Sequence, residues 1–154
     1  ISVAKEAGIF LKIAGNVPNN PSDRLYFETV VKPQLGDGRE WVGTVNDQQK
    51  NDFLGQAQAL LFPIRWDEPF GIVMAESLAC GTPVIATRRA STPEVIDHGR
   101  TGFLCNSADE MIKAVRQSRT LDRRNCRRAA EIRFSSQTMV ENYLKIIYRL
   151  VSLD

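Results

Sequence analysis

The strongest constraint on the fold is an alternation of short apolar segments with longer stretches of helical periodicity along the 154-residue chain. Each apolar segment is apolar on both faces, as expected of strands that are covered on two sides. The segments are residues 9–15, 40–45, 59–64, 83–87 and 102–105. The alternation predicts an α/β fold, with a doubly wound parallel sheet of at least five strands and helices on both of its faces.

Helix candidates fill the intervals, at residues 21–35, 46–57, 71–80, 91–99, 107–118 and 135–150. Ser22 or Asp23 is expected to cap the first helix and Asn46 or Asp47 the second, because their side-chain oxygens can accept from the free N–H groups of a first turn. Gly81 suits the position after the third helix. No strand follows the last helix, so we expect it to pack outside the sheet.

The charge pattern bounds the choice of partner. A formal net charge of +2 is too small to indicate a nucleic acid as a partner. The charge is uneven, since residues 111–134 hold eight lysines and arginines against two acidic residues. Such a stretch is typical of a solvated helix surface. Contact with anionic lipid or with a second domain is the alternative.

The cysteines and the hydropathy indicate the compartment. Cys80, Cys105 and Cys126 are widely spaced and form no CxxC pair, which favours reduced cytosolic thiols over zinc or redox chemistry. No apolar run reaches the ~18 residues of a membrane span, and no signal peptide is recognisable. We therefore expect a cytoplasmic protein, with peripheral contact to a membrane surface as the open alternative. Because the first residue is Ile1, the chain looks like a piece of a longer protein.

The loop "RWDEPFG", residues 65–71, follows the third apolar segment and precedes the third helix. In open α/β sheets, ligands bind beyond the carboxyl ends of the strands, where this loop is expected to lie. The first N–H groups of the helix have no helical partner and, with the helix dipole, favour an anion such as phosphate. Gly71 would let a ligand approach the backbone closely. The sequence thus predicts a phosphate site at this helix start.

Two glutamates bracket the Pro-Phe-Gly turn. On a helical projection, one apolar face comprises Ile72, Ala75, Leu78 and Ala79, and a second stripe comprises Val73, Glu76 and Cys80. Glu76 then lies one turn inside the helix, beside the anion site. A carboxylate only accepts hydrogen bonds, so it can hold two adjacent hydroxyls, as on a ribose. Glu68, on the loop, can meet the hydroxyls of a sugar. A nucleoside diphosphate sugar satisfies all three groups.

Other interpretations of the glutamates stay open. Each can be an ordinary solvated residue, or the pair can be the acid and base of a glycosidase. The glycosidase is disfavoured, because neither residue has an evident partner to hold its proton. The chain has no DxD, no HxxxH, no Walker sequence and no GxGxxG, and its one histidine, His98, is best placed as a helix-end residue. No metal site is predicted.

Several segments together resemble a known family. "EPFGIVMAE", residues 68–76, resembles the E-x7-E element of retaining glycosyltransferases of family 4, which have the two-Rossmann-domain architecture called GT-B. "LKIAG", "WVGTVNDQQKNDFLGQAQALLFPIRWDEPFG", "ACGTPVIATRRASTPEVIDHGRTGFLC" and "RFSSQTMVENYLKIIYRL" are similar to further segments of that family. The resemblance covers roughly residues 9 to 150.

The resemblance implies a Rossmann-like donor-binding domain, the C-terminal half of a GT-B protein, over residues 1–154. It implies that Glu76 binds the ribose hydroxyls and that Glu68 is catalytic and faces the transferred sugar. It further implies three sets of donor contacts. These are backbone N–H groups of Phe70, Gly71, Ile72 and Val73 for the sugar and diphosphate, residues Val45, Asn46 and Lys50 near the base, and Gly15 near the diphosphate.

The chain also departs from the family pattern. The first strand of the domain, an arginine and a lysine that offset the diphosphate charge, and the whole N-terminal acceptor domain would precede Ile1. Arg88 and Arg89 stand where a glycine-rich turn is common, and they would add bulk and charge near the donor. Residues 1–154 by themselves are therefore expected to transfer no sugar, and the acceptor domain is an expected partner.

The expected activity is transfer of a hexose from a nucleoside diphosphate sugar, with retention of configuration and without a metal or other cofactor. The alternatives are a nucleotide-sugar epimerase or phosphorylase of the same architecture, and a non-catalytic module that binds nucleotide sugars. The sequence identifies neither the base, nor the sugar, nor the acceptor.

Overall fold

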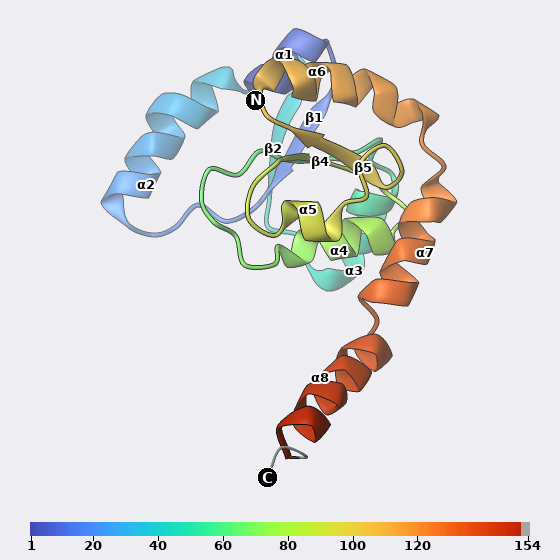
Figure 1. Ribbon diagram of the computed structural model, residues 1–154. Helices are drawn as coiled ribbons and strands as arrows, with labels where there is room; N and C mark the ends of the chain where they lie inside the picture. Colours follow the sequence, from blue (N-terminus) through green and yellow to red (C-terminus); the bar gives the residue numbers. More distant parts are fainter. Residues whose placement is uncertain (152–154) are drawn as a thin grey trace.

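The computed structural model describes residues 1–151. All five expected strands are present, and every pairing between them is parallel. The strands are β1 (Leu11–Ala14), β2 (Arg39–Gly43), β3 (Leu60–Phe62), β4 (Val84–Thr87) and β5 (Gly102–Cys105). They form two sheets rather than one, in the orders β1-β2 and β3-β4-β5 (Figure 1). The predicted α/β class with parallel strands is confirmed, and within the described residues the strands are divided between two sheets.

The two sheets correspond to two sets of neighbouring strands in a doubly wound fold. In a sheet with strand order 3-2-1-4-5-6, strands 2 and 3 lie on one side of the first strand and strands 4, 5 and 6 on the other. The observed orders β1-β2 and β3-β4-β5 match these two sets.

Helices cover both faces of the three-stranded sheet, as the alternation predicts. Val84, Ala86 and Leu104 pack against α4 (Ile72–Ala79), α5 (Thr92–Val95) and α7 (Arg123–Arg133). On the other face, Ile85 and Cys105 pack against α6 (Ala108–Gln117), beside α1 (Ser2–Ala7). Figure 1 shows α1 and α6 above the strands and α4 and α5 below them. The successive residues of β4 therefore point into two separate apolar cores.

The smaller sheet is less covered. The expectation that every strand is buried on both faces is wrong for β1 and β2, where Lys12, Glu40 and Val42 are exposed. Neither α2 (Pro21–Tyr26) nor the irregular turns that continue it, η1 (Phe27–Val31) and η2 (Lys32–Gln34), buries a residue. The reason is that α2 lies to the side of the strands rather than over them (Figure 1).

Helix starts follow the capping rules, with one error in the predicted residue. Asn20, rather than Ser22 or Asp23, caps α2, because Pro21 is fixed in a conformation that suits the first helical position. Asn46 caps α3 (Asp47–Gly55), as predicted, in a reciprocal box with Gln49. Ser107 caps α6, where its side chain accepts from the N–H of Glu110.

Part of the basic stretch folds back onto its own domain. Arg123 donates to the carbonyl oxygens of Gly55 and Ala57, each at 2.7 Å, and to Thr82 Oγ1. Arg127 donates to Ala79 O, at the end of α4, and Arg133 donates to Glu94 O. These arginines satisfy carbonyl groups that the ends of α3, α4 and α5 leave free. The interpretation as a purely solvated surface is therefore wrong for these three residues. The short turn η3 (Ser118–Thr120) joins α6 to the loop that leads into α7.

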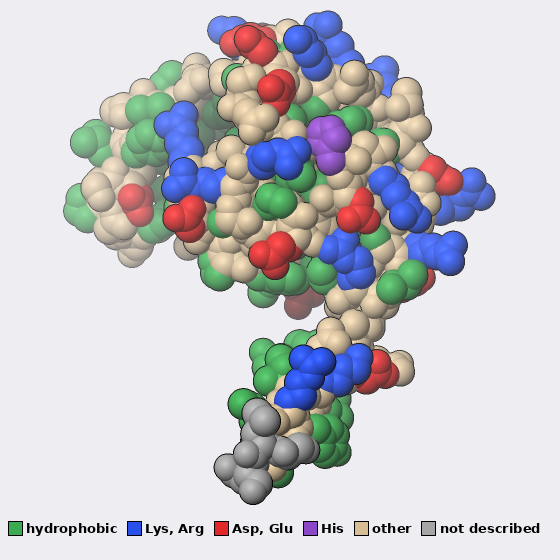
Figure 2. Space-filling view, in the orientation of Figure 1, with side chains coloured by type: hydrophobic (Ala, Val, Ile, Leu, Met, Phe, Trp, Pro, Cys, Tyr) green, Lys and Arg blue, Asp and Glu red, His purple; other side chains and the backbone are tan. Residues whose placement is uncertain are grey.

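The last helix, α8 (Ser136–Val151), extends away from both sheets (Figure 1), which confirms its expected place outside the sheet. Its apolar side chains are exposed and appear as the green surface of the lower body in Figure 2. They include Met139, Val140, Leu144, Ile146, Ile147, Leu150 and Val151. In the described part of the chain, no helix has the length and apolar character needed to cross a bilayer.

Candidate functional site

The Pro-Phe-Gly turn lies where the sequence predicts it, after the carboxyl end of β3 and before α4. Gly71 is the N-cap of α4 and has a φ of 73°, a conformation that glycine adopts without steric cost. A Cβ at this residue would lie 2.7 Å from Met74 Cε and 3.2 Å from Phe62 Cζ. Backbone conformation and close packing therefore both require glycine here, and they fix where the free N–H groups of α4 point.

Glu68 is held within its own loop. Its Oε1 accepts from the N–H of Gly71 at 3.2 Å, and its Oε2 accepts from Trp66 Nε1 at 3.0 Å. The sequence analysis predicted the glutamate but not the tryptophan that fixes it. In this structure the Gly71 N–H, one of the predicted ligand contacts, is occupied by Glu68. The first two helical residues, Ile72 and Val73, keep N–H groups without an acceptor inside the helix.

The orientation of α4 differs from the helical projection. The buried residues are Met74, Ser77 and Leu78, whereas Ile72, predicted on the apolar face, is 67% exposed. The sheet lies against the face that includes Met74, which turns Ile72 out beside the loop. Glu76 is half-buried on an adjacent side, and its carboxylate reaches toward α3. The predicted separation of Glu76 from the core is correct, and Leu78 and Ala79 of the predicted apolar face do reach the core. The prediction is wrong for Ile72, and Met74 lies in the core instead.

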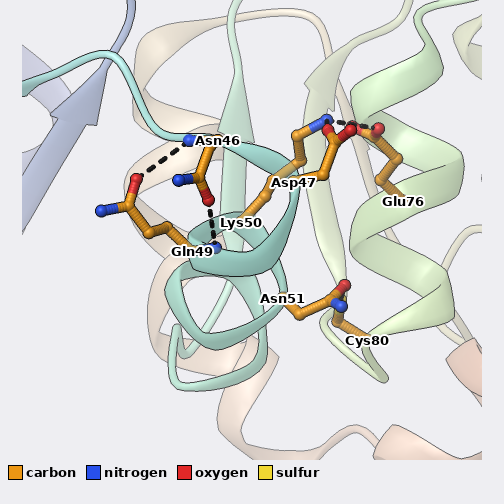
Figure 3. Close-up of polar contacts among 7 residues, drawn as sticks. All are labelled: Asn46, Asp47, Gln49, Lys50, Asn51, Glu76 and Cys80. Carbon is orange, nitrogen blue, oxygen red and sulfur yellow. Dashed lines mark hydrogen bonds and ion pairs between the residues drawn. The ribbon is translucent and has the colours of Figure 1, made fainter.

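Lys50 and Glu76 form an ion pair between α3 and α4. Lys50 Nζ lies 2.7 Å from Glu76 Oε1 and 3.2 Å from Asp47 Oδ1, and the three side chains converge in Figure 3. The exposed fractions of the Lys50 and Glu76 side chains are 28% and 33%. The hydrogen bond to Glu76, with that to Asp47, raises the pKa of Lys50 above its ordinary value. The two predicted donor-binding residues thus meet each other, a contact that the sequence analysis did not anticipate.

A hollow of about 750 Å³ opens beside this ion pair, between α3, α4 and α7. Lys50 and Glu76 line it together with Asn51 and Cys80, whose side chains approach each other in Figure 3. Its far wall carries three arginines of α7, namely Arg123, Arg124 and Arg127. No local sequence pattern predicts this wall, because α7 is distant in the chain from both other helices.

The remaining predicted contacts lie in the β1–β2 half. Gly15 follows β1, and its N–H donates to Gly43 O at 2.8 Å. Val45 follows β2, and the side chain of Asn46 is used in the cap of α3, where it accepts from Gln49 N. Among residues 1–151, no hydrogen bond joins Gly15, Val45 or Asn46 to the start of α4. Their roles toward a donor stay predictions.

Two further contacts join the loop to its surroundings. Phe70 packs edge-on against Phe134, with 5.7 Å between the ring centroids. Arg89, in the turn that replaces the family's glycine-rich one, pairs with Asp67 through a 2.8 Å contact from its Nε. The next residue, Ala90, has a φ of 49°. The turn thus keeps a backbone conformation that favours glycine, although it carries alanine.

The remaining groups to consider are the three cysteine thiols and the side chains that could bind a metal ion. Burial raises the pKa of the Cys105 and Cys126 thiols to about 11, so both stay protonated near neutral pH. All three cysteines are free. Within the described range, no cluster of three or more His, Cys, Asp or Glu side chains is placed to hold a metal ion. The site thus offers the N–H groups at the start of α4 to an anion, and the carboxylates of Glu68 and Glu76 to hydroxyl groups.

Comparison with known proteins identifies the family to which the chain belongs. The family described as Glycosyl transferases group 1 matches residues 2–119, and the chain belongs to this family. The chain is 32% identical over 152 residues to an uncharacterized 41.2 kDa protein in the cps region of Klebsiella pneumoniae, covering 95% of this chain and 40% of that protein.

Solved structures show the same fold. Sucrose-phosphate synthase from Thermosynechococcus elongatus superposes with a TM-score of 0.79 at 26% identity, over 99% of this chain and 42% of that one. Anabaena HepE in complex with UDP-glucose gives a TM-score of 0.76 at 19% identity, over 96% and 44%. The predicted Rossmann-like fold of a GT-B protein is thereby confirmed. The chain spans less than half the length of each of these proteins.

Proposed function

We propose that residues 1–154 form the donor-binding domain of a retaining, metal-independent glycosyltransferase that takes a hexose from a nucleoside diphosphate sugar. The observation that carries the proposal is the junction at α4. The helix opens at the carboxyl edge of the sheet with Glu68 before its first turn and Glu76 one turn inside it. Membership of the family, and the UDP-glucose bound to HepE, support a nucleotide sugar as the ligand.

In this proposal the reaction breaks the bond between the anomeric carbon and the diphosphate and forms a bond to an acceptor hydroxyl on the same face of the sugar. The N–H groups of Ile72 and Val73, with the dipole of α4, stabilise charge on the leaving diphosphate. Glu68 faces the transferred sugar, and Glu76 accepts from the ribose hydroxyls. Gly15, Val45, Asn46 and Lys50 complete the donor site from the β1–β2 half. The acceptor binds to a second domain. The protein is cytoplasmic in this proposal, which its free thiols support.

The activity test uses the full-length protein with a panel of UDP, GDP and ADP sugars, and measures release of the nucleoside diphosphate. Release that needs a sugar acceptor supports the transferase. Conversion of the sugar without an acceptor would instead indicate an epimerase, and phosphate-dependent turnover would indicate a phosphorylase. Binding without turnover would indicate a non-catalytic module. Nuclear magnetic resonance of the product's anomeric proton distinguishes retention from inversion.

The role of Glu76 has its own prediction. Glu76→Gln keeps the size of the side chain but removes the charge that strengthens its hydrogen bonds, each worth about 1.5–3 kcal/mol. We expect nucleotide-sugar binding to weaken about ten-fold or more, as measured by calorimetry. Glu131→Gln is the matched control, because Glu131 pairs with Arg127 on the surface of α7 at 2.6 Å. Unchanged affinity in Glu76→Gln would reject the ribose role.

A further inference from the structure

Lys50 engages only one of the two oxygens of Glu76. Its Nζ contacts Oε1 at 2.7 Å, and Oε2 has no hydrogen-bond partner among residues 1–151. Both side chains line the 750 Å³ hollow and are partly exposed. A carboxylate oxygen can accept more than one hydrogen bond, so Oε2 alone can serve two adjacent hydroxyls. One oxygen of the Glu76 carboxylate is thus held by Lys50, and the other can accept hydrogen bonds from a ligand.

We propose that Lys50 is a positioning residue, which fixes the Glu76 carboxylate through Oε1 so that Oε2 is presented to the ribose hydroxyls of the donor. The proposal rests on the proposed function of Glu76 and replaces the expected contact between Lys50 and the base. It makes an ion pair between two helices a determinant of the preference for ribose over 2′-deoxyribose.

The support for Lys50 comes from α3. Lys50 is in the first turn of this helix, whose start is fixed by the reciprocal cap between Asn46 and Gln49. Asp47 Oδ1 also lies 3.2 Å from Lys50 Nζ, although the side chain of Asp47 is 99% exposed. A lysine ammonium is charged at neutral pH, and the hydrogen bonds to Glu76 and Asp47 raise the pKa of Lys50 further. A carboxylate that is fixed before binding loses less conformational entropy when the ligand arrives.

The pair also spans the divided sheet. Lys50 follows β2 of the smaller sheet, whereas Glu76 follows β3 of the larger one. Among the described residues of α3 and α4, Lys50 and Glu76 form the ion pair between the two helices. Any displacement of α3 would therefore reorient Glu76.

The test is a cycle of variants and ligands, measured by calorimetry on the full-length protein. The probes are UDP, GDP and ADP with their 2′-deoxy counterparts, and the pair used is the one whose ribose form the unaltered protein binds. Lys50→Met removes the charge while keeping a similar length, and Lys50→Arg keeps the charge. Lys113→Met, an exposed lysine of α6, is the matched control for lost charge, and thermal melting checks that each variant is folded.

We expect Lys50→Met to weaken binding of the ribose nucleotide about ten-fold and that of the 2′-deoxy nucleotide less than about two-fold, because only the former uses the oriented oxygen. Lys50→Arg should restore most of the preference, and Lys113→Met should change neither affinity. Equal losses for both nucleotides would show that Lys50 contacts the base or the phosphates, and tighter binding in Lys50→Met would show that the ion pair competes with the ligand. Either result overturns this inference alone. If the unaltered protein binds no nucleotide, the proposed function fails and the inference fails with it.

Discussion

The two sheets differ in how they are stabilised, although both are parallel and both were expected from similar apolar segments. In the β3–β5 half, β4 is almost completely buried between helices on two faces. In the β1–β2 half, β2 alternates half-buried with exposed residues, and α2 buries none. Within the described residues before β3, Ala4 and Leu54 are the buried apolar side chains. A parallel sheet is stable only when both faces are covered, so the smaller sheet depends on neighbours more than the larger one does.

This difference bears on the candidate site, because its residues come from both halves. Gly71, Glu68 and the backbone of Glu76 belong to the well-packed half, whereas Lys50 and the loop after β2 belong to the half with little core. Arg123 and Thr82 link the halves, since both bond to carbonyl groups near the end of α3. The start of α4 is therefore placed by a well-packed core, whereas the position of α3 beside it depends on a few polar contacts.

The largest expected effect is that of Gly102→Ala in β5. A Cβ at this residue would lie 1.9 Å from Val84 O, which is backbone and cannot rotate away. We expect a loss of more than about 3 kcal/mol in the free energy of unfolding, above the usual cost of overpacking. Chemical denaturation measures it. Gly55→Ala, at the end of α3 in the other half, meets no atom within 4 Å and should stabilise by about 0.5–1 kcal/mol.

The next effect compares the same substitution in the two sheets. Ile85→Ala in β4 removes a side chain that is 0% exposed, and we expect a loss of about 2–5 kcal/mol. Ile13 in β1 is only partly buried, so Ile13→Ala should cost about 1 kcal/mol. Denaturant midpoints and their slopes give both values. Equal losses would contradict the comparison and would mean that the smaller sheet carries a core of similar strength.

The smallest expected effect concerns two residues with positive φ. Ala90 has a φ of 49°, which is unfavourable for a residue with a Cβ, and Ala90→Gly should raise the free energy of unfolding by about 0.5–1 kcal/mol. Asp37, in the other half, has a φ of 48°, but aspartate tolerates this conformation better. Asp37→Gly should therefore change stability by less than about 0.5 kcal/mol. Thermal melts of both variants would sharpen the comparison, and a destabilised Ala90→Gly would show that the alanine methyl contributes packing.

Much of the fold could be predicted because it depends on local patterns. The five apolar segments became the five strands, and Asn46, Ser107 and Gly71 lie at helix starts as their residue types favour. The observed cap of α2, Asn20, lies two or three residues before the predicted Ser22 or Asp23, because Pro21 suits the first helical position. Burial was overestimated for β1 and β2, because apolar composition does not show whether a helix will cover a strand.

The same holds for the site: features set by neighbouring residues could be predicted, and features set by distant segments could not. A helix that starts after a Pro-Phe-Gly turn, with a carboxylate on each side, can be predicted because this information lies within nine consecutive residues. The packing of the chain, by contrast, sets which face of α4 is buried, holds Glu68 through Trp66 and the Gly71 N–H, and brings Lys50 to Glu76. It also sets the division of the sheet and the position of the α7 arginines. The physical reason is that capping and backbone conformation act between near neighbours in the chain, whereas charge pairing and burial depend on which segments the fold brings together.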